Sequence, residues 1–334
     1  MAETAQITLN KINGDAKLNL QIEVQNGKKG YMPVIADTVT LTTERKDTPG
    51  KLEFSVIWDK KLKIEEGNPV KLTVKKKVLF YGFIFTFSHT KSSVVKITAY
   101  DQVRYLLNKD TYYFKKQTAD SIIKMVAKDY GLRVGSIAET GYTIPARLMD
   151  NKTLLDMMQD SLEITLTNNK KLFCLYDKAG KLTLKQSADM KIGLLIDADT
   201  AEDFDYSSTI DSGVYNVIKL VYEKDGKRTA YVAQDKTTQK KWGSLQYFEK
   251  IDDTKNANNK AKTLLNLYNL KNKALTVRNC LGDLRIRAGC MVLVRLTLHD
   301  MKISNWMLVE TCTHKFTNNQ HTMTLKLRGG EFAG

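Results

Sequence analysis

Hydrophobic and polar residues alternate along most of the first 115 residues. Such a period of two is typical of strands with one buried face, and it is found at residues 39–43, 52–56, 70–74, 78–85 and 94–100. Thr48-Pro49-Gly50 supplies a turn between the first two stretches, and Lys75-Lys76-Lys77 stands where a hairpin loop is expected. Several short strands at this spacing predict a sandwich or a barrel.

The period becomes helical between residues 116 and 200. Residues 119–130 carry apolar side chains on one side, with Thr118 placed to cap the start and Gly131 to stop the end. A second helix is expected from Thr153, because Asp156 follows three residues later in a capping pattern. A hairpin over residues 172–184 completes a compact α/β insert.

The last third returns to strands. Residues 217–222 and 228–233 flank Asp225-Gly226 and predict a hairpin with a tight turn. Residues 254–270 predict a helix, and strands resume from 275 to 327. The stretch 197–211 carries six acidic residues and no basic one, which suits either a linker or an acidic patch.

These patterns predict a mostly β (α+β) protein with two related β-barrel-like domains separated by a small α/β domain. The expected bounds are 1–115 for the first β domain, 116–200 for the insert and 201–334 for the second β domain, which includes the helix near 254–270. At 334 residues the chain is long enough for two or three domains.

The two β regions share a pattern that suggests an internal duplication. Gly67-x-x-Val70 opens a strand, and a second, more buried strand ends near His89. Gly289-x-x-Val292 does the same, and its second strand ends near His314. A third strand closes each set, so both regions read as strand, hairpin, buried strand, turn and strand.

Charge fits this division. The net charge is +15, made of +7 in residues 1–115, +1 in 116–200 and +7 in 201–334. A module that reads DNA sequence would concentrate its basic residues on one patch, whereas here the excess is shared by the two ends. The candidate electrostatic contacts are Lys60, Lys61, Lys75, Lys76 and Lys77, and solvated loop tips are the simpler interpretation of all five.

Motifs that would indicate catalysis are missing from the sequence. No HExxH, Gly-x-Ser-x-Gly or phosphate-binding loop occurs, and the four widely spaced cysteines suit small buried residues in strands.

His314 and His321 could pair on a metal, but histidines at strand ends near solvent are the favoured interpretation. Asp156 with Asp160, and Asp252 with Asp253, are interpreted as surface acids rather than hydrolase carboxylates. The tryptophans are interpreted as core or contact residues rather than sugar-stacking ones. We therefore expect no enzyme, no metal and no cofactor.

The order of these stretches resembles one family. Its pattern is carried by residues 67–84, by 97–106, by the helix 118–130 with Gly131-Leu132, by Gly282 to Gly289, and by 309–316. It is similar to contractile-tail baseplate hubs, the family of late-control protein D and the XkdQ-like hubs of PBSX-type particles. Through that family it is also similar to the phage T4 hub and to the N-terminal part of type VI secretion spikes.

The resemblance implies a structural role. Such hubs place two related barrels in each chain, and three chains form a ring with pseudo-sixfold symmetry between a hexameric tube and a trimeric spike. The expected partners are two further copies, the tail tube protein, a separate spike, a baseplate wedge or LysM-type tail protein, and a tape-measure protein or DNA in the lumen. The expected place is the baseplate of a virion or tail-like bacteriocin, assembled in the bacterial cytoplasm without a signal peptide or membrane insertion.

Two other functions suit parts of the sequence. Aromatic residues and basic charge also fit a cell-wall-binding module or a peptidoglycan hydrolase of the same particle. Charge alone would fit a nucleic-acid-binding protein, whose contacts would weaken steeply with salt. The basic excess itself suits either a pore lining or an outer surface that meets acidic partners.

Overall fold

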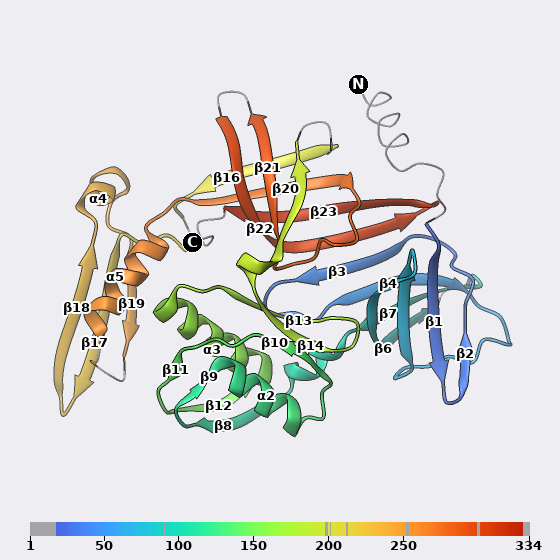
Figure 1. The fold of residues 1–334 in the computed structure, drawn as a ribbon, viewed down its shortest axis with the longest axis horizontal. Helices are drawn as coiled ribbons and strands as arrows, with labels where there is room; N and C mark the ends of the chain where they lie inside the picture. The colour runs from blue at the N-terminus through green and yellow to red at the C-terminus, as the bar shows by residue number, and fades with distance from the viewer. Residues whose placement is uncertain are drawn as a thin grey trace.

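The computed structural model describes residues 18–329, apart from 90, 198–199, 201, 212, 252–253, 255 and 299–300. Strands dominate it, and helices gather in two smaller units below and beside the main sheet (Figure 1). The mostly β fold class expected from the alternating pattern is therefore confirmed.

The first β module is an antiparallel sheet with the strand order β3-β4-β7-β6-β5-β1-β2. All five strands expected from the period of two are present. Lys75 and Lys76 have positive φ angles in the two-residue turn between β5 and β6, a geometry that matches the twist of a hairpin. The strands are β1 (Leu20–Asn26), β2 (Lys29–Tyr31), β3 (Val39–Glu44), β4 (Lys51–Ile57), β5 (Pro69–Val74), β6 (Lys77–His89) and β7 (Val94–Tyr100).

A small α/β unit follows, with its own apolar core around two helices. The predicted helices are present, and Thr153 caps the second by accepting the N–H of Asp156 at 3.0 Å. Strand β8 pairs with β12, so residues from 109 onward belong to this unit. Its elements are η1 (Gln102–Leu107), β8 (Lys109–Phe114), β9 (Gln117–Thr118), α2 (Ala119–Asp129), β10 (Val134–Ile137), β11 (Thr143–Ile144), β12 (Arg147–Thr153), α3 (Leu154–Asn169), β13 (Phe173–Asp177), β14 (Leu182–Gln186) and η2 (Ser187–Met190).

The second β module has the order β16-β20-β23-β22-β21, and β15 lies parallel to β21 at its side. Part of the acidic stretch is therefore a strand and not only a linker, because β16 pairs with β20 over seven residues. The strands are β15 (Lys191–Ile196), β16 (Asp203–Thr209), β20 (Asn272–Leu281), β21 (Met291–Leu298), β22 (Met301–Thr317) and β23 (Gln320–Gly329).

The predicted hairpin at 217–233 and the helix near 254–270 form a separate outer unit, inserted between β16 and β20. Its sheet has the order β18-β17-β19, and its own core packs against α5. It stands at one end of the long axis (Figure 1). Its elements are β17 (Val217–Lys224), β18 (Lys227–Gln234), α4 (Lys236–Trp242), β19 (Gln246–Lys250) and α5 (Ala257–Tyr268).

The two β modules repeat one hydrogen-bond pattern. The N–H of Gly67 donates to the carbonyl of Ile84 at 2.8 Å, and the N–H of Gly289 donates to the carbonyl of Val309 at 2.8 Å. Both glycines have positive φ, at +84° and +90°. A bulge directly follows Ile84 in β6 and Val309 in β22. The pattern suggested by the sequence is thus present as matched backbone geometry.

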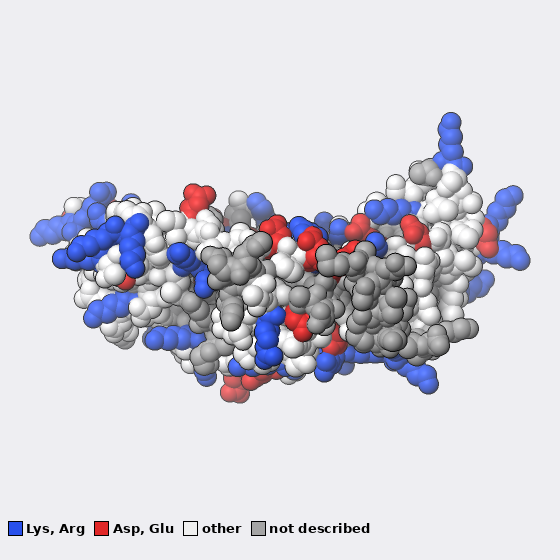
Figure 2. All heavy atoms as spheres, turned by 90° about the horizontal axis from the view of Figure 1, so that it is seen from above, with Lys and Arg blue, Asp and Glu red and all other residues white. Residues whose placement is uncertain are grey.

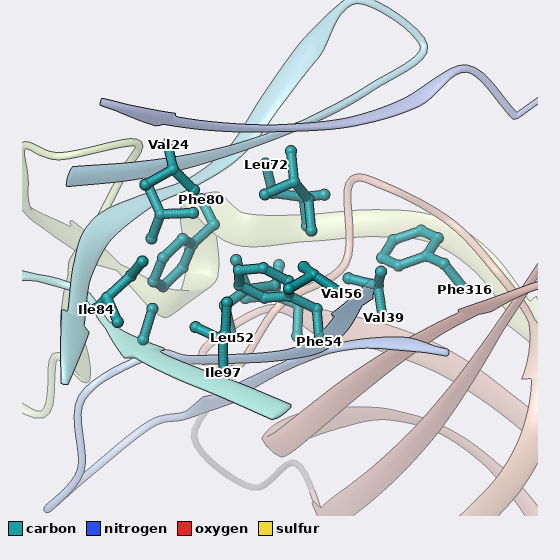
Figure 3. Packing of buried hydrophobic residues seen from close by; sticks show 14 of the residues in the cluster. Val24, Val39, Leu52, Phe54, Val56, Leu72, Phe80, Ile84, Ile97 and Phe316 are labelled. Carbon is teal, nitrogen blue, oxygen red and sulfur yellow. The ribbon is translucent and has the colours of Figure 1, made fainter. Parts of the chain in front are cut away.

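The modules do not stand apart as two barrels. Strand β3 of the first pairs with β22 of the second, which joins both into one 13-stranded sheet. Phe316 of β22 packs with Val39 in the core of the first module (Figure 3). No closed barrel is present among the described strands. Joining the two modules removes an open edge from each, which is the physical reason for the merger.

Candidate functional site

The five candidate lysines lie in two turns of the first module. Lys60 and Lys61 are exposed in the turn after β4, and Lys75 and Lys76 form the exposed β5–β6 turn. Lys77 is also exposed, and its ammonium group donates to the carbonyl of Leu284 in the second module at 3.0 Å. One of the five thus contacts the other module of its own chain, and contacts of the lysines with a partner remain a prediction.

The structure does not bring the two lysine turns together. The N–H of Lys75 donates to the carbonyl of Leu18, just before β1 begins. The chain after Lys61 is held by the side chain of Asn26, which donates to the carbonyl of Lys63 at the far end of β1. These ends of β1 are roughly 25 Å apart at about 3.3 Å per residue. The lysines therefore form two separate charged tips.

The seam between the modules is a continuous antiparallel strand pairing. Six residue pairs run from Glu44 opposite Thr311 to Val39 opposite Phe316. The hydroxyl groups of Thr42 and Thr313, directly opposite each other, lie 3.3 Å apart. Sequence reasoning missed this seam, because strand partners far apart in the chain leave no local signal.

Ion pairs close one end of the seam. The Arg45 guanidinium donates to the Glu310 carboxylate at 2.6 Å, and Arg328 approaches the same carboxylate at 2.9 Å. The side chain of Arg45 is only 7% exposed. Glu310 thus accepts from both modules, which orients the seam as well as stabilising it.

A second contact ties the α/β unit to both modules. Arg287 stacks over the ring of Tyr176, with 3.7 Å from its guanidinium carbon to the ring centre, and donates to the carbonyl of Asp177 at 2.8 Å. The neighbouring N–H of Ala288 donates to the hydroxyl of Thr43 at 3.0 Å. The loop before β21 therefore positions all three parts of the chain.

Replacing Arg287 by Met is expected to lower the free energy of unfolding by about 2 kcal/mol, because a cation–π contact and a charged hydrogen bond are both lost. Denaturant titration measures the loss. Arg278→Met is the matched control: Arg278 is 44% exposed in its ion pair with Asp203, and such surface pairs contribute about 0–1 kcal/mol. Equal losses in the two variants would contradict the expectation.

Two buried carboxyl groups lie beside this contact. Asp101 accepts the N–H groups of Gly50 and Val103 at 2.9 and 3.0 Å, and Asp177 accepts from Gln102 at 2.7 Å. Burial, and next the charge of Asp177, raise the pKa of Asp101 to about 8. Burial also raises the pKa of Asp177. Their partners are backbone groups and a neighbouring side chain, so a structural role explains the pair.

A hollow of about 240 Å³ opens beside the same contact. Its walls combine apolar side chains with basic ones and carry no pair of facing carboxylates suited to hydrolysis. Lining residues include Lys77, Leu79, Tyr176, Arg285 and Arg287.

The expectation that His314 and His321 lie near solvent is wrong. They are 3% and 5% exposed, and His314 Nδ1 lies 2.9 Å from His321 Nε2. The other nitrogen of His314 lies 2.9 Å from the carbonyl of Ile286. No group of three His, Cys, Asp or Glu side chains could hold a metal ion within the described part of the chain. The two rings pack against each other and against the backbone of Ile286 and Gly282, contacts that no local sequence pattern indicates.

The remaining candidates fall in ordinary places. All four cysteines are buried, as expected, but Cys290 lies in the loop just before β21 and not in a strand. Asp160 pairs with Lys152 at 2.6 Å on the surface of the α/β unit. Asp252 and Asp253 lie outside the described residues. Among the residues that the structure describes, no helix is long and apolar enough to cross a membrane.

Basic side chains gather at both ends of the long axis, while acidic ones lie mostly near its middle (Figure 2). One end is the outer unit, whose β17–β18 turn region carries exposed Lys224, Lys227 and Arg228. The sequence showed a basic excess in residues 1–115 and 201–334, but not that an inserted unit holds much of the excess of the last segment.

Comparison with known proteins gives a family match over most of the chain. The model of the YqbQ-like family matches residues 39–328. Two proteins of Bacillus subtilis (strain 168) are similar over 305 residues: YqbQ at 29% identity and the phage-like element PBSX protein XkdQ at 28%. Each alignment covers 88% of this chain, and 92% and 93% of the respective relative.

Solved structures share the fold at low identity. The tail protein from Neisseria meningitidis MC58 has a TM-score of 0.71 at 12% identity, covering 94% of this chain and 97% of that one. An E. coli component of the type VI secretion system has a TM-score of 0.58 at 10% identity, covering 94% of this chain and 78% of that one. That component is itself described as similar in structure to the T4 tail proteins gp27 and gp5.

Proposed function

The chain belongs to the YqbQ-like family, and on that premise we propose that it is the structural hub subunit of a contractile-tail or tail-like baseplate. Three copies would form a ring that joins the sixfold tail tube to a separate trimeric spike. The resemblance to XkdQ-like proteins stated from the sequence is confirmed by the family match and by XkdQ itself.

One observation carries the proposal: each chain holds two β modules with matched backbone geometry, joined edge to edge. Gly67 with Ile84 and Gly289 with Val309 make the same hydrogen bond, so the strands around them occupy corresponding places in the two modules. Three chains supply six such modules, and a threefold ring can then meet a sixfold tube through near-equivalent contacts.

The names of the similar proteins support the setting. XkdQ is a protein of a phage-like element, and the Neisseria structure is that of a tail protein. By this reasoning the partners are the tube protein, the spike and a wedge or LysM-type tail protein, and the place is the particle baseplate. The role proposed is assembly rather than catalysis.

The basic ends of the molecule suit contacts in such an assembly. Exposed Lys60, Lys61, Lys75 and Lys76 would meet acidic surfaces of neighbouring proteins, or a tape-measure chain or DNA that passes through the lumen. Attraction of this kind ignores sequence and weakens as salt rises.

The proposal is tested by mass and by imaging. The chain, co-expressed with the tube and spike proteins of its own particle, is expected to purify as a trimer by light scattering. Particle images should then place it on the tube axis, between tube and spike. A chain that stays monomeric at high concentration with both partners present, or that lies off the axis, would overturn the proposal. Lysis of purified cell wall by the chain alone would favour the hydrolase instead.

A further inference from the structure

The matched hydrogen bonds fix which strands of the two modules correspond. In the first module the strand pairing runs from Ile84 of β6 through Ala99 and Leu52 to Leu41 of β3. Each residue in this series lies directly opposite the next. Strand β3 is therefore reached from β6 by three steps across the sheet.

The same three steps exist in the second module. Pairing runs from Val309 of β22 through Leu327 and Leu275 to Tyr206 of β16. Since Ile84 and Val309 occupy equivalent places, Tyr206 corresponds to Leu41. Strand β16 is thus the counterpart of β3, and β6 is the counterpart of β22.

Counting past the two bulges extends the correspondence along β6 and β22. Thr86 matches Thr311, and three positions further on His89 matches His314. The intrachain seam is formed by β22 in this stretch, where His314 lies opposite Leu41. Each module therefore contains both kinds of strand that form the seam. Within one chain the first module uses only β3 and the second uses only β22.

The two unused halves are open edges. Among the described residues β16 pairs only with β20, and the end of β6 from Thr86 to His89 pairs only with β7. Exposed backbone edges of this kind favour pairing with another chain unless they are covered. In the intrachain seam the counterparts of both edges are covered.

We propose that β16 of one subunit pairs antiparallel with the end of β6 in the next copy of this chain, and so repeats the intrachain seam between subunits. His89 then lies opposite the partner subunit's Tyr206, and Ser88 opposite the partner subunit's Ser207. The contact is head to tail, so it generates a ring when three copies close. The inference rests on the proposed trimeric function and names the surface that builds it.

Side chains at the β6 edge suit this role. Phe87 and His89 pack around Trp58, with ring centres 5.9 and 5.5 Å from it, and both remain accessible to solvent. Their counterparts Cys312 and His314 are 0% and 3% exposed; they lie in the stretch of β22 that pairs with β3, and His314 also contacts the carbonyl of Ile286. A strand paired to the β6 edge would likewise remove part of the aromatic cluster from solvent.

The hydroxyl pair of the seam is also repeated. Thr42 and Thr313 approach within 3.3 Å inside the chain. Ser207 and Ser88 occupy the matching positions on the two open edges, and both are exposed. Paired hydroxyl residues are among the favourable cross-strand neighbours.

Cysteine cross-linking tests the register. Chains carrying Ser88→Cys and Ser207→Cys, assembled with tube and spike proteins, are oxidised and separated on a non-reducing gel. We expect covalent dimers and trimers, because directly opposite residues lie within disulfide reach. Ser88→Cys with Thr209→Cys is the matched control. Its side chains are diagonal neighbours about 7–8 Å apart, so at least about tenfold less product is expected, and equal products in both variants would overturn the register.

Introducing charges on the two edges gives an independent readout of assembly. Ser88→Asp with Ser207→Asp puts like charges across the seam, and trimer formation is expected to weaken roughly tenfold. Ser88→Lys with Ser207→Asp should restore it. Thr229→Asp with Ser244→Asp adds the same charge to exposed positions of the outer unit and should leave assembly unchanged.

The outcomes separate this inference from the function on which it rests. Trimers of the original chain that resist both seam variants, with no register-specific cross-link, overturn the seam and leave the hub intact. A chain that remains monomeric with its partners overturns the hub itself. Circular dichroism and melting temperature confirm that each variant is folded before assembly is scored.

Discussion

Lowering the pH from 7 to 5 is expected to remove about 4 kcal/mol of unfolding free energy through His314 and His321 alone. Burial lowers the pKa of His314 from 6.5 to about 4. Burial, followed by the neighbouring His314, lowers the pKa of His321 to about 3. Below pH 6.5 these histidines therefore bind protons in the unfolded chain but not in the folded chain, so the free energy of unfolding falls as the pH is lowered from that value.

The hydrogen bonds explain why neither ring accepts a proton. The carbonyl of Ile286 can only accept, so His314 Nε2 carries the hydrogen of that bond. His314 Nδ1 is then an acceptor for the N–H at His321 Nε2. A proton added at His314 Nδ1 would remove this acceptor, so the bond would break unless His321 moved its own hydrogen from Nε2 to Nδ1.

Chemical unfolding at pH 7 and pH 5 measures this effect as a difference between variants. Asp101 titrates with the opposite sign, since its raised pKa stabilises the folded chain as pH falls from about 8. The comparison therefore uses His314→Gln with His321→Gln, which should lose about 4 kcal/mol less than the original chain on acidification. A substitution without a titratable group provides the control, so Thr229→Gln at an exposed position of the outer unit should leave the acid response unchanged. An acid response that both variants share would refute the assignment.

Replacing Gly289 by Ala is expected to lower the free energy of unfolding by about 3 kcal/mol or more. Gly289 has a φ of +90°, which L-residues with a side chain rarely adopt. An added methyl group would also lie 2.4 Å from Cys174 Sγ in the α/β unit. Strain and overlap therefore act together where the second module meets that unit.

The first module offers a matched control for this substitution. Gly67 has the same role and a φ of +84°, but no atom lies within 4 Å of an added methyl group. Gly67→Ala should therefore cost only the backbone strain, roughly 1–2 kcal/mol. Melting temperature and denaturant midpoint both report the difference. Equal costs at the two glycines would show that contact with Cys174 contributes nothing.

Local patterns were sufficient to predict most elements of this protein. The alternating stretches became β3 to β7, Thr153 caps α3 as its spacing with Asp156 indicates, and Asp225-Gly226 turns the β17–β18 hairpin. Each of these features depends on residues within a few positions of one another, so the sequence contains the whole of the physical cause. The correspondence between Gly67 and Gly289 in the two modules was visible in the sequence for the same reason.

Partners distant in the chain could not be read in this way. Thr42 and Thr313 are 271 positions apart in the chain and meet across the seam, and His314 is buried against Ile286 and Leu41, which are also distant from it in the chain. The hairpin after Val217 looked like part of the second module, yet its apolar face is covered by its own helix α5. Alternation indicates that one face of a strand is buried, but not which neighbour buries it. The sequence by itself thus determined the strands, helices, turns and their repetition. Only the tertiary structure decided which edges are closed and which remain open, because edge pairing depends on backbone groups that every residue carries alike.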